Sequence, residues 1–128
     1  MLGRTKRDRE YIKQIKGNKM SINISELQKE IHNLAKEKGW WVSEREFGTL
    51  CALIHSEVSE LFEAFRKDKL YSPCDKDPSM SNFEEEAADI FIRLADMCEW
   101  YEIDLGKAIE KKHAYNAIRS YRHGGKKA

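Results

Sequence analysis

Apolar residues recur every three to four positions along several stretches of the chain, a spacing that buries one face of an α-helix. The stretches cover residues 24–38, 44–67, 83–101 and 104–120. The last one opens with Asp104, a residue type that caps helices. Both prolines, Pro73 and Pro78, fall within 68–82 among many turn residues, so this segment is predicted as the main loop. The pattern predicts an all-α fold, a bundle of four main helices.

Short polar residues set the predicted helix boundaries. Ser25 and Gln28, and again Ser43 and Glu46, have the spacing of a capping box, in which two side chains satisfy free backbone N–H groups. Gly39 follows the first periodic stretch, and glycine commonly ends a helix there. We therefore predict Ser25 as the N-cap of the first helix, at about 24–38, and a second helix that begins just after Ser43.

The length of 128 residues fits one domain. Residues 1–20 are basic and show little helical periodicity, so we predict a flexible basic leader at 1–20 and the folded domain at 21–128. A net charge of +1 gives no overall attraction to nucleic acid. No apolar run is long enough to cross a membrane, so no membrane partner is expected.

Cysteine is sparse, with Cys51, Cys74 and Cys98 and no C-x-x-C pair. This usage indicates neither a disulfide framework nor a thiolate zinc site. Two of the three lie in apolar helical patterns, where a thiol acts as a small core residue. A reducing, cytoplasmic location is expected.

Two pairs of carboxylates stand three residues apart, Glu57 and Glu60 in the second helix and Glu86 and Asp89 in the third. Residues at this spacing share one helix face. Leu61, an apolar-face residue, lies one turn after Glu57, so the acids are expected at the edge of the buried face. Like charges repel more strongly as water is excluded, and such a group then requires a compensating cation.

Oxygen ligands without thiolates or paired histidines favour Mg²⁺, with Mn²⁺ as a second option. An ion held in this way bridges to substrate phosphates, which predicts metal-assisted hydrolysis of a phosphoryl compound. Arg93, between Asp89 and Asp96, is expected either to bridge those two acids or to reach a phosphate. The other acids of these helices are expected to be solvated or paired with lysine or arginine: Glu63, Glu84, Glu85, Asp96 and Glu99.

The order of these motifs resembles the MazG-like all-α nucleoside triphosphate pyrophosphohydrolases. An E-x-x-E at 57–60 is followed, after a spacer of 25 residues, by an E-x-x-D at 86–89. Gly39-Trp40-Trp41 ahead of the second helix is similar to the branch that includes the dCTP pyrophosphatases. The C-terminal segments at 112–119 and 123–126 are also similar to the family, and the likeness covers about residues 22–126.

The resemblance implies hydrolysis of a (deoxy)nucleoside triphosphate to the monophosphate and pyrophosphate, in the sanitation of nucleotide pools. The implied metal ligands and catalytic residues are Glu57, Glu60, Glu86 and Asp89. The implied substrate contacts are His32 and Trp41 with the base, and Lys112, Asn116 and Arg119, with Arg93, at the phosphates. It also implies a homo-oligomer, a tetramer built from dimers or a dimer, with sites near the interface. Short helices that leave Phe91, Met97 and Trp100 poorly covered favour such an assembly.

Two other interpretations compete. A di-iron carboxylate bundle needs two E-x-x-H motifs, whereas Glu110 and His113 supply one. A helical interaction or nucleic-acid-binding module would use the basic leader and tail. Against it, the central helices are acidic where a nucleic-acid groove would be basic, so nucleic acid is an unlikely partner.

Overall fold

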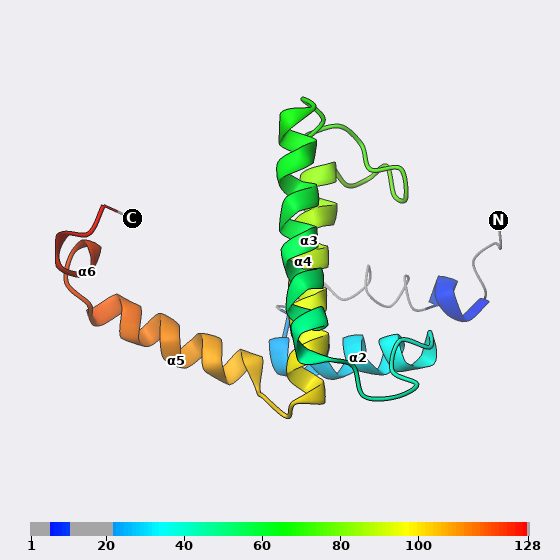
Figure 1. Ribbon diagram of the computed structural model, residues 1–128, viewed down its shortest axis with the longest axis horizontal. Helices are drawn as coiled ribbons and strands as arrows, with labels where there is room; N and C mark the ends of the chain where they lie inside the picture. The colour runs from blue at the N-terminus through cyan, green and yellow to red at the C-terminus, as the bar shows by residue number, and fades with distance from the viewer. Residues whose placement is uncertain (1–5, 11–21, 128) are drawn as a thin grey trace.

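The structure is a computed structural model that describes residues 6–10 and 22–127. Its main elements, drawn in Figure 1, are all helices, which confirms the all-α prediction. They are α2 (Ile24–Glu37), α3 (Phe47–Arg66), α4 (Asn82–Trp100), α5 (Leu105–Ile118) and α6 (Arg122–Gly125). α6 lies after residue 120, where the predicted fourth helix ends. Apart from 6–10, which form a helical turn, the predicted leader lies outside the described residues.

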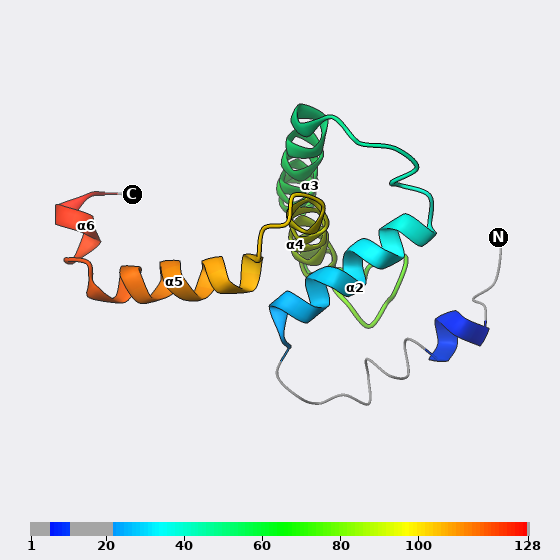
Figure 2. The ribbon, with the colours of Figure 1, turned by 90° about the horizontal axis from the view of Figure 1, so that it is seen from below.

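Three helices form the packed part of the chain. α3 and α4 run side by side in opposite directions, and α2 crosses α4 near the end of α4 (Figures 1 and 2). α5 meets α2 at one end and then leads away from the other helices (Figure 1). The four main helices predicted from the sequence are therefore present, but α5 does not close a four-helix bundle within this chain.

The start of α5 is fixed by buried polar contacts. Gln28, only 3% exposed, accepts a hydrogen bond from the N–H of Leu105 and donates to the carbonyl of Ile103 at 2.7 Å. Asp104 caps α5 as predicted, accepting from the N–H of Lys107. These bonds set the direction in which α5 leaves the packed helices.

The predicted N-terminal caps of α2 and α3 are wrong. Asn23, rather than Ser25, caps α2 by accepting from the N–H of Glu26 at 3.1 Å. α3 begins at Phe47, so the segment before it, including Ser43, is not helical. The tertiary structure overrides the local signal there, because the segment 38–46 brings Trp41 into the core, where it is 8% exposed.

The end of α2 follows the sequence prediction. Gly39 has φ +89°, a left-handed conformation that favours glycine. Its N–H donates to the carbonyl of Lys36, and the N–H of Trp40 donates to the carbonyl of Ala35 at 3.0 Å. This pair of bonds is a Schellman motif, and it turns the chain sharply back toward α4.

In the described part of the chain, no helix combines the length and the apolar character needed to cross a membrane.

Candidate metal and phosphate site

The antiparallel pairing of α3 and α4 brings the predicted acids together. Single carboxylate oxygens of Glu57, Glu86 and Asp89 lie within 4.8 Å of one another. Ligand oxygens on one Mg²⁺ are roughly 3–4 Å apart, because each stands about 2.1 Å from the ion. Small side-chain rotations would therefore let these three oxygens share an ion. We call Glu57, Glu60, Glu86 and Asp89 the acidic cluster.

Burial differs across the acidic cluster. Glu57 is 6% exposed, Glu86 and Asp89 are half-buried, and Glu60 is exposed at the edge. Within the described residues, two buried side-chain oxygens lack a hydrogen-bond partner, Oε2 of Glu57 and Oε2 of Glu86. A buried carboxylate oxygen without a donor is unfavourable. Neither group has an N–H or O–H of its own when ionised, so a shared proton, a bridging water or a cation must satisfy these oxygens.

The electrostatics of the acidic cluster show the same conflict. Burial, and then the adjoining carboxyls of Glu57 and Glu60, raise the pKa of Glu86 to about 7. The pKa of Asp89 is raised by burial and then by the charge of Glu57. The pKa of Glu60 is raised by the adjoining carboxyl of Glu57 and then by burial. Without a cation, the cluster therefore binds protons more tightly than free carboxylates do.

Glu57 is the exception within the acidic cluster. Burial alone would raise the pKa of Glu57, but the hydrogen bond from Arg93 leads several contacts that bring it below its ordinary value. Nε of Arg93 donates to Oε1 of Glu57 at 2.6 Å. Arg93 thus pairs with Glu57 across the two helices and does not bridge Asp89 and Asp96. The contact fixes one oxygen of Glu57, whereas the other, Oε2, is buried without a hydrogen-bond partner.

A cavity of about 700 Å³ adjoins the acidic cluster. This volume is within the range of small-molecule sites, roughly 300–1,000 Å³. Its apolar wall comes from α2 and α4, including Ile31 and Phe91, and Glu57 and Asp89 line a polar part. Trp40, 63% exposed, also lines the cavity. The arrangement can receive a ligand that is charged at one end and apolar at the other.

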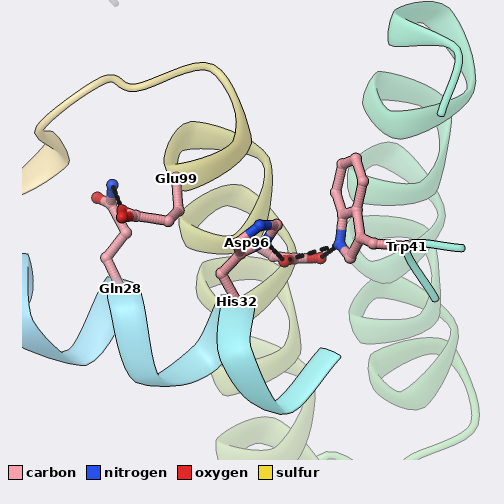
Figure 3. Close-up of polar contacts among 5 residues, drawn as sticks. All are labelled: Gln28, His32, Trp41, Asp96 and Glu99. Carbon is pink, nitrogen blue, oxygen red and sulfur yellow. Dashed lines mark hydrogen bonds and ion pairs between the residues drawn. The ribbon is translucent and has the colours of Figure 1, made fainter. Parts of the chain in front are cut away.

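His32 and Trp41 meet around a buried acid, Asp96. Figure 3 shows both side chains directed at its carboxylate. Nε1 of Trp41 donates to both Asp96 oxygens, at 3.0 and 2.9 Å, and Nδ1 of His32 lies 2.7 Å from Oδ1. Trp100 stacks on Trp41 with ring centroids 4.6 Å apart. His32 and Trp41, the two predicted base contacts, are both buried in this structure. Asp96 and Trp40, which directly precedes Trp41, line the cavity.

The predicted phosphate contacts of α5 lie apart from the acidic cluster of the same chain, because α5 leads away from α3 and α4 (Figure 1). Nζ of Lys112 and the guanidinium of Arg119 lie over the ring of Tyr115, at 4.9 and 5.4 Å. Asn116 is exposed. Glu110 and His113, the motif of the di-iron alternative, are exposed on the same helix.

Sequence reasoning missed the role of Asp96, which was expected to be solvated or paired with lysine or arginine. Asp96 is 9% exposed and bonded to two aromatic side chains. The signal was available, because Asp96 follows Asp89 by two helical turns and therefore shares its face. Reasoning also missed Lys76 of the loop, whose Nζ lies 2.7 Å from Oε1 of Glu85.

Comparisons with models of known protein families, with curated proteins and with solved structures found no significant match to this chain. The likeness to the MazG-like enzymes therefore rests on the motifs quoted above.

Proposed function

We propose that this chain is a magnesium-dependent hydrolase that cleaves a (deoxy)nucleoside triphosphate to the monophosphate and pyrophosphate. One observation carries the proposal: on two neighbouring helices, a buried carboxylate oxygen of Glu57 and one of Glu86 have no hydrogen-bond donor. Asp89 adds a third oxygen within 4.8 Å. If these acids only stabilised the fold, each would be expected to pair with a basic side chain, as acids on the surface do.

The residues fit Mg²⁺, with Mn²⁺ as a substitute, because all the ligands are carboxylates. Glu57, Glu86 and Asp89 would hold the ion, and Glu60 at the edge would reach it by a side-chain rotation. When bound, the ion supplies charge that neutralises phosphate oxygens and lowers the pKa of an attacking water. Arg93 keeps the Glu57 carboxylate in place, since its bond to Oε1 leaves Oε2 for the cluster.

The cavity supports a nucleotide as the substrate. Its polar part would face the phosphates, and the apolar wall of α2 and α4 with the Trp40 indole would face the base. His32 and Trp41 hold Asp96, which lines the same cavity. His32 and Trp41 would therefore affect the bound base indirectly, by fixing the position of Asp96. The expected substrate is a deoxynucleotide such as dCTP.

Exposed apolar side chains support a homo-oligomer, a tetramer built from dimers or a dimer. Phe62 and Phe65 of α3 are 60% and 61% exposed and stack on each other, and Ile118 of α5 is 82% exposed. The residues expected to be uncovered, such as Trp100, are half-buried instead. If α5 acts as the resemblance implies, its Lys112, Asn116 and Arg119 serve the acidic cluster of another copy.

We place the enzyme in the cytoplasm, in the sanitation of nucleotide pools. Its cysteines, Cys51, Cys74 and Cys98, are all free, which suits a reducing compartment.

The test is a screen of the common ribo- and deoxynucleoside triphosphates with Mg²⁺, assaying pyrophosphate and orthophosphate separately. We expect pyrophosphate release that stops on chelation. Glu60→Ala is expected to reduce the rate by about two orders of magnitude or more, because it removes a ligand of the activating ion. Glu63→Ala is the matched control on α3, since Glu63 pairs with Lys67 on the surface. Orthophosphate as the product, or activity insensitive to chelation, would contradict the proposal.

A further inference from the structure

The loop between α3 and α4 is folded into a closed turn. The N–H of Cys74 donates to the carbonyl of Met80 at 2.8 Å, and the Cys74 side chain is 1% exposed. The N–H of Asn82 donates to the carbonyl of Ser72 at 3.0 Å. These bonds hold the base of the turn, and within it the Asp77 carboxylate accepts from the N–H and the hydroxyl of Ser79.

Lys76 extends from this turn to α4. Its Nζ lies 2.7 Å from Oε1 of Glu85, whose Oε2 accepts from the thiol of Cys74 at 3.0 Å. Glu85 directly precedes Glu86 and stands one turn before Asp89. The hydrogen bond to Glu85 raises the pKa of Lys76, and the charges of Glu85, Asp89 and Glu86 add to this effect. The ammonium is therefore charged and next to the acidic cluster.

The ion pair of Lys76 is accessible from one side. The Lys76 side chain is 81% exposed, whereas that of Glu85 is 13% exposed. Because the lysine end of the pair is open to solvent, water and salt screen the attraction between the two charges. Lys76 also lines the cavity, together with Glu57 and Asp89. A charged ligand in the cavity can therefore reach the ammonium.

We propose that Lys76 is a phosphate-binding residue of this site, and that its ammonium moves from Glu85 to the phosphate oxygens of a bound nucleoside triphosphate. This inference rests on the proposed function. Divalent ions in the acidic cluster cancel the negative charge that attracts Lys76, while the triphosphate brings new negative charge into the cavity. A lysine ammonium on a flexible stem suits this exchange, because it binds phosphate as a point charge from many directions.

The experiment compares Lys76→Ala, Lys76→Arg and Lys69→Ala in the full chain. Lys69 is an exposed lysine of the same loop and serves as the control. Two affinities are measured for each protein: that for Mn²⁺ alone, by electron paramagnetic resonance, and that for a non-hydrolysable triphosphate analogue with Mg²⁺, by calorimetry. We expect Lys76→Ala to weaken analogue binding about tenfold. Its Mn²⁺ affinity should stay equal or rise, because a repelling charge is lost, and Lys76→Arg should restore most of the analogue affinity.

The outcomes separate this inference from the proposed function. If the wild type releases pyrophosphate and Lys76→Ala binds the analogue as the wild type does, the role of Lys76 is overturned and the proposed function stands. If the analogue binds in a Lys76-dependent way but no pyrophosphate is released, the role of Lys76 stands and the hydrolase does not. An equal loss of Mn²⁺ and analogue affinity in Lys76→Ala would assign a structural role and overturn the inference. A wild type that binds no analogue overturns both.

Discussion

Asp96 and Asp89 stand two turns apart on one face of α4, yet the side chains that surround them differ in kind. Asp96 receives the indole N–H of Trp41 and a ring nitrogen of His32 (Figure 3). Asp89 faces carboxylates from α3 and α4, and two oxygens of that cluster, on Glu57 and Glu86, have no partner. The helix is the same, but the partners of one acid are donors and those of the other are acceptors.

From this difference we infer a structural role for Asp96, and we base on it the functional role proposed for Asp89. A buried carboxylate surrounded by N–H donors is satisfied by the fold and ties α2 and the segment after it to α4. A carboxylate surrounded by other carboxylates is left unsatisfied by the fold and requires a ligand from outside. Burial of an acid is therefore no guide to its role until the donors around it are counted.

The largest expected effect that separates the two acids is on activity. Asp89→Asn should reduce pyrophosphate release by about two orders of magnitude or more, because it removes a ligand of the activating ion. Asp96→Asn should change kcat by less than about tenfold, since Asp96 bonds His32 and Trp41 and lies outside the acidic cluster. Steady-state kinetics with Mg²⁺ measure both variants. Equal losses in kcat would show that Asp89 and Asp96 do not differ in role.

The same two substitutions should shift stability in opposite directions in the presence of a chelator. Asp96→Asn weakens charge-assisted bonds in the core, and we expect the free energy of unfolding to fall by about 1–3 kcal/mol. Asp89→Asn removes one of several like charges, and we expect a rise of about 0.5–1 kcal/mol at pH 8, the scale of partly exposed charge interactions. Urea unfolding with the two-state analysis gives both values. A loss of stability in both variants would show that Asp89 is held by its own structural partners.

The helices could be predicted from the sequence because each has an apolar face of its own. α2, α4 and α5 were expected to span 24–38, 83–101 and 104–120, and each lies within a few residues of those limits. The start of α3 could not be predicted, because Ser43 and Glu46 carry a local capping signal that the burial of Trp41 overrides. The direction of α5 depends on Gln28, which contacts residues far away in the sequence.

The acids of the candidate site could be predicted because their spacing fixes a face on each helix, and pairing two helices then brings the faces together. Lys76 could not be found in this way, since loop residues have no periodicity and its place depends on the closed turn after α3. Which of Trp40 and Trp41 is buried was also beyond the pattern. The local turn decides which of two adjacent residues is buried, and here Gly39 sets that turn.

The last expected effect concerns pH, and it follows from the raised pKa of Glu86, about 7 against an ordinary 4.5. A carboxyl that holds its proton more tightly when folded adds stability at low pH, and this contribution is lost as pH rises through the folded pKa. The pKa of Glu57 is lowered, so its effect on stability has the opposite sign. That effect occurs below pH 4.5, the ordinary pKa of this group, and therefore outside the range of pH 5.5–8. The chelated protein should therefore lose stability between pH 5.5 and 8.

Thermal unfolding tests this expectation with Glu86→Gln as the reference, because the reference retains every other titrating group. In chelator, the melting temperature of the wild type relative to Glu86→Gln should fall by roughly 3–8 °C from pH 5.5 to pH 8. Saturating Mg²⁺ should reverse the loss at pH 8 and have less effect at pH 5.5, since protons compete with the ion for the same oxygens. A relative melting temperature that is flat across this range would mean that the acids of α3 and α4 do not repel one another. The case for an ion between them would then fail, whereas the donor-satisfied Asp96 cluster would be unaffected.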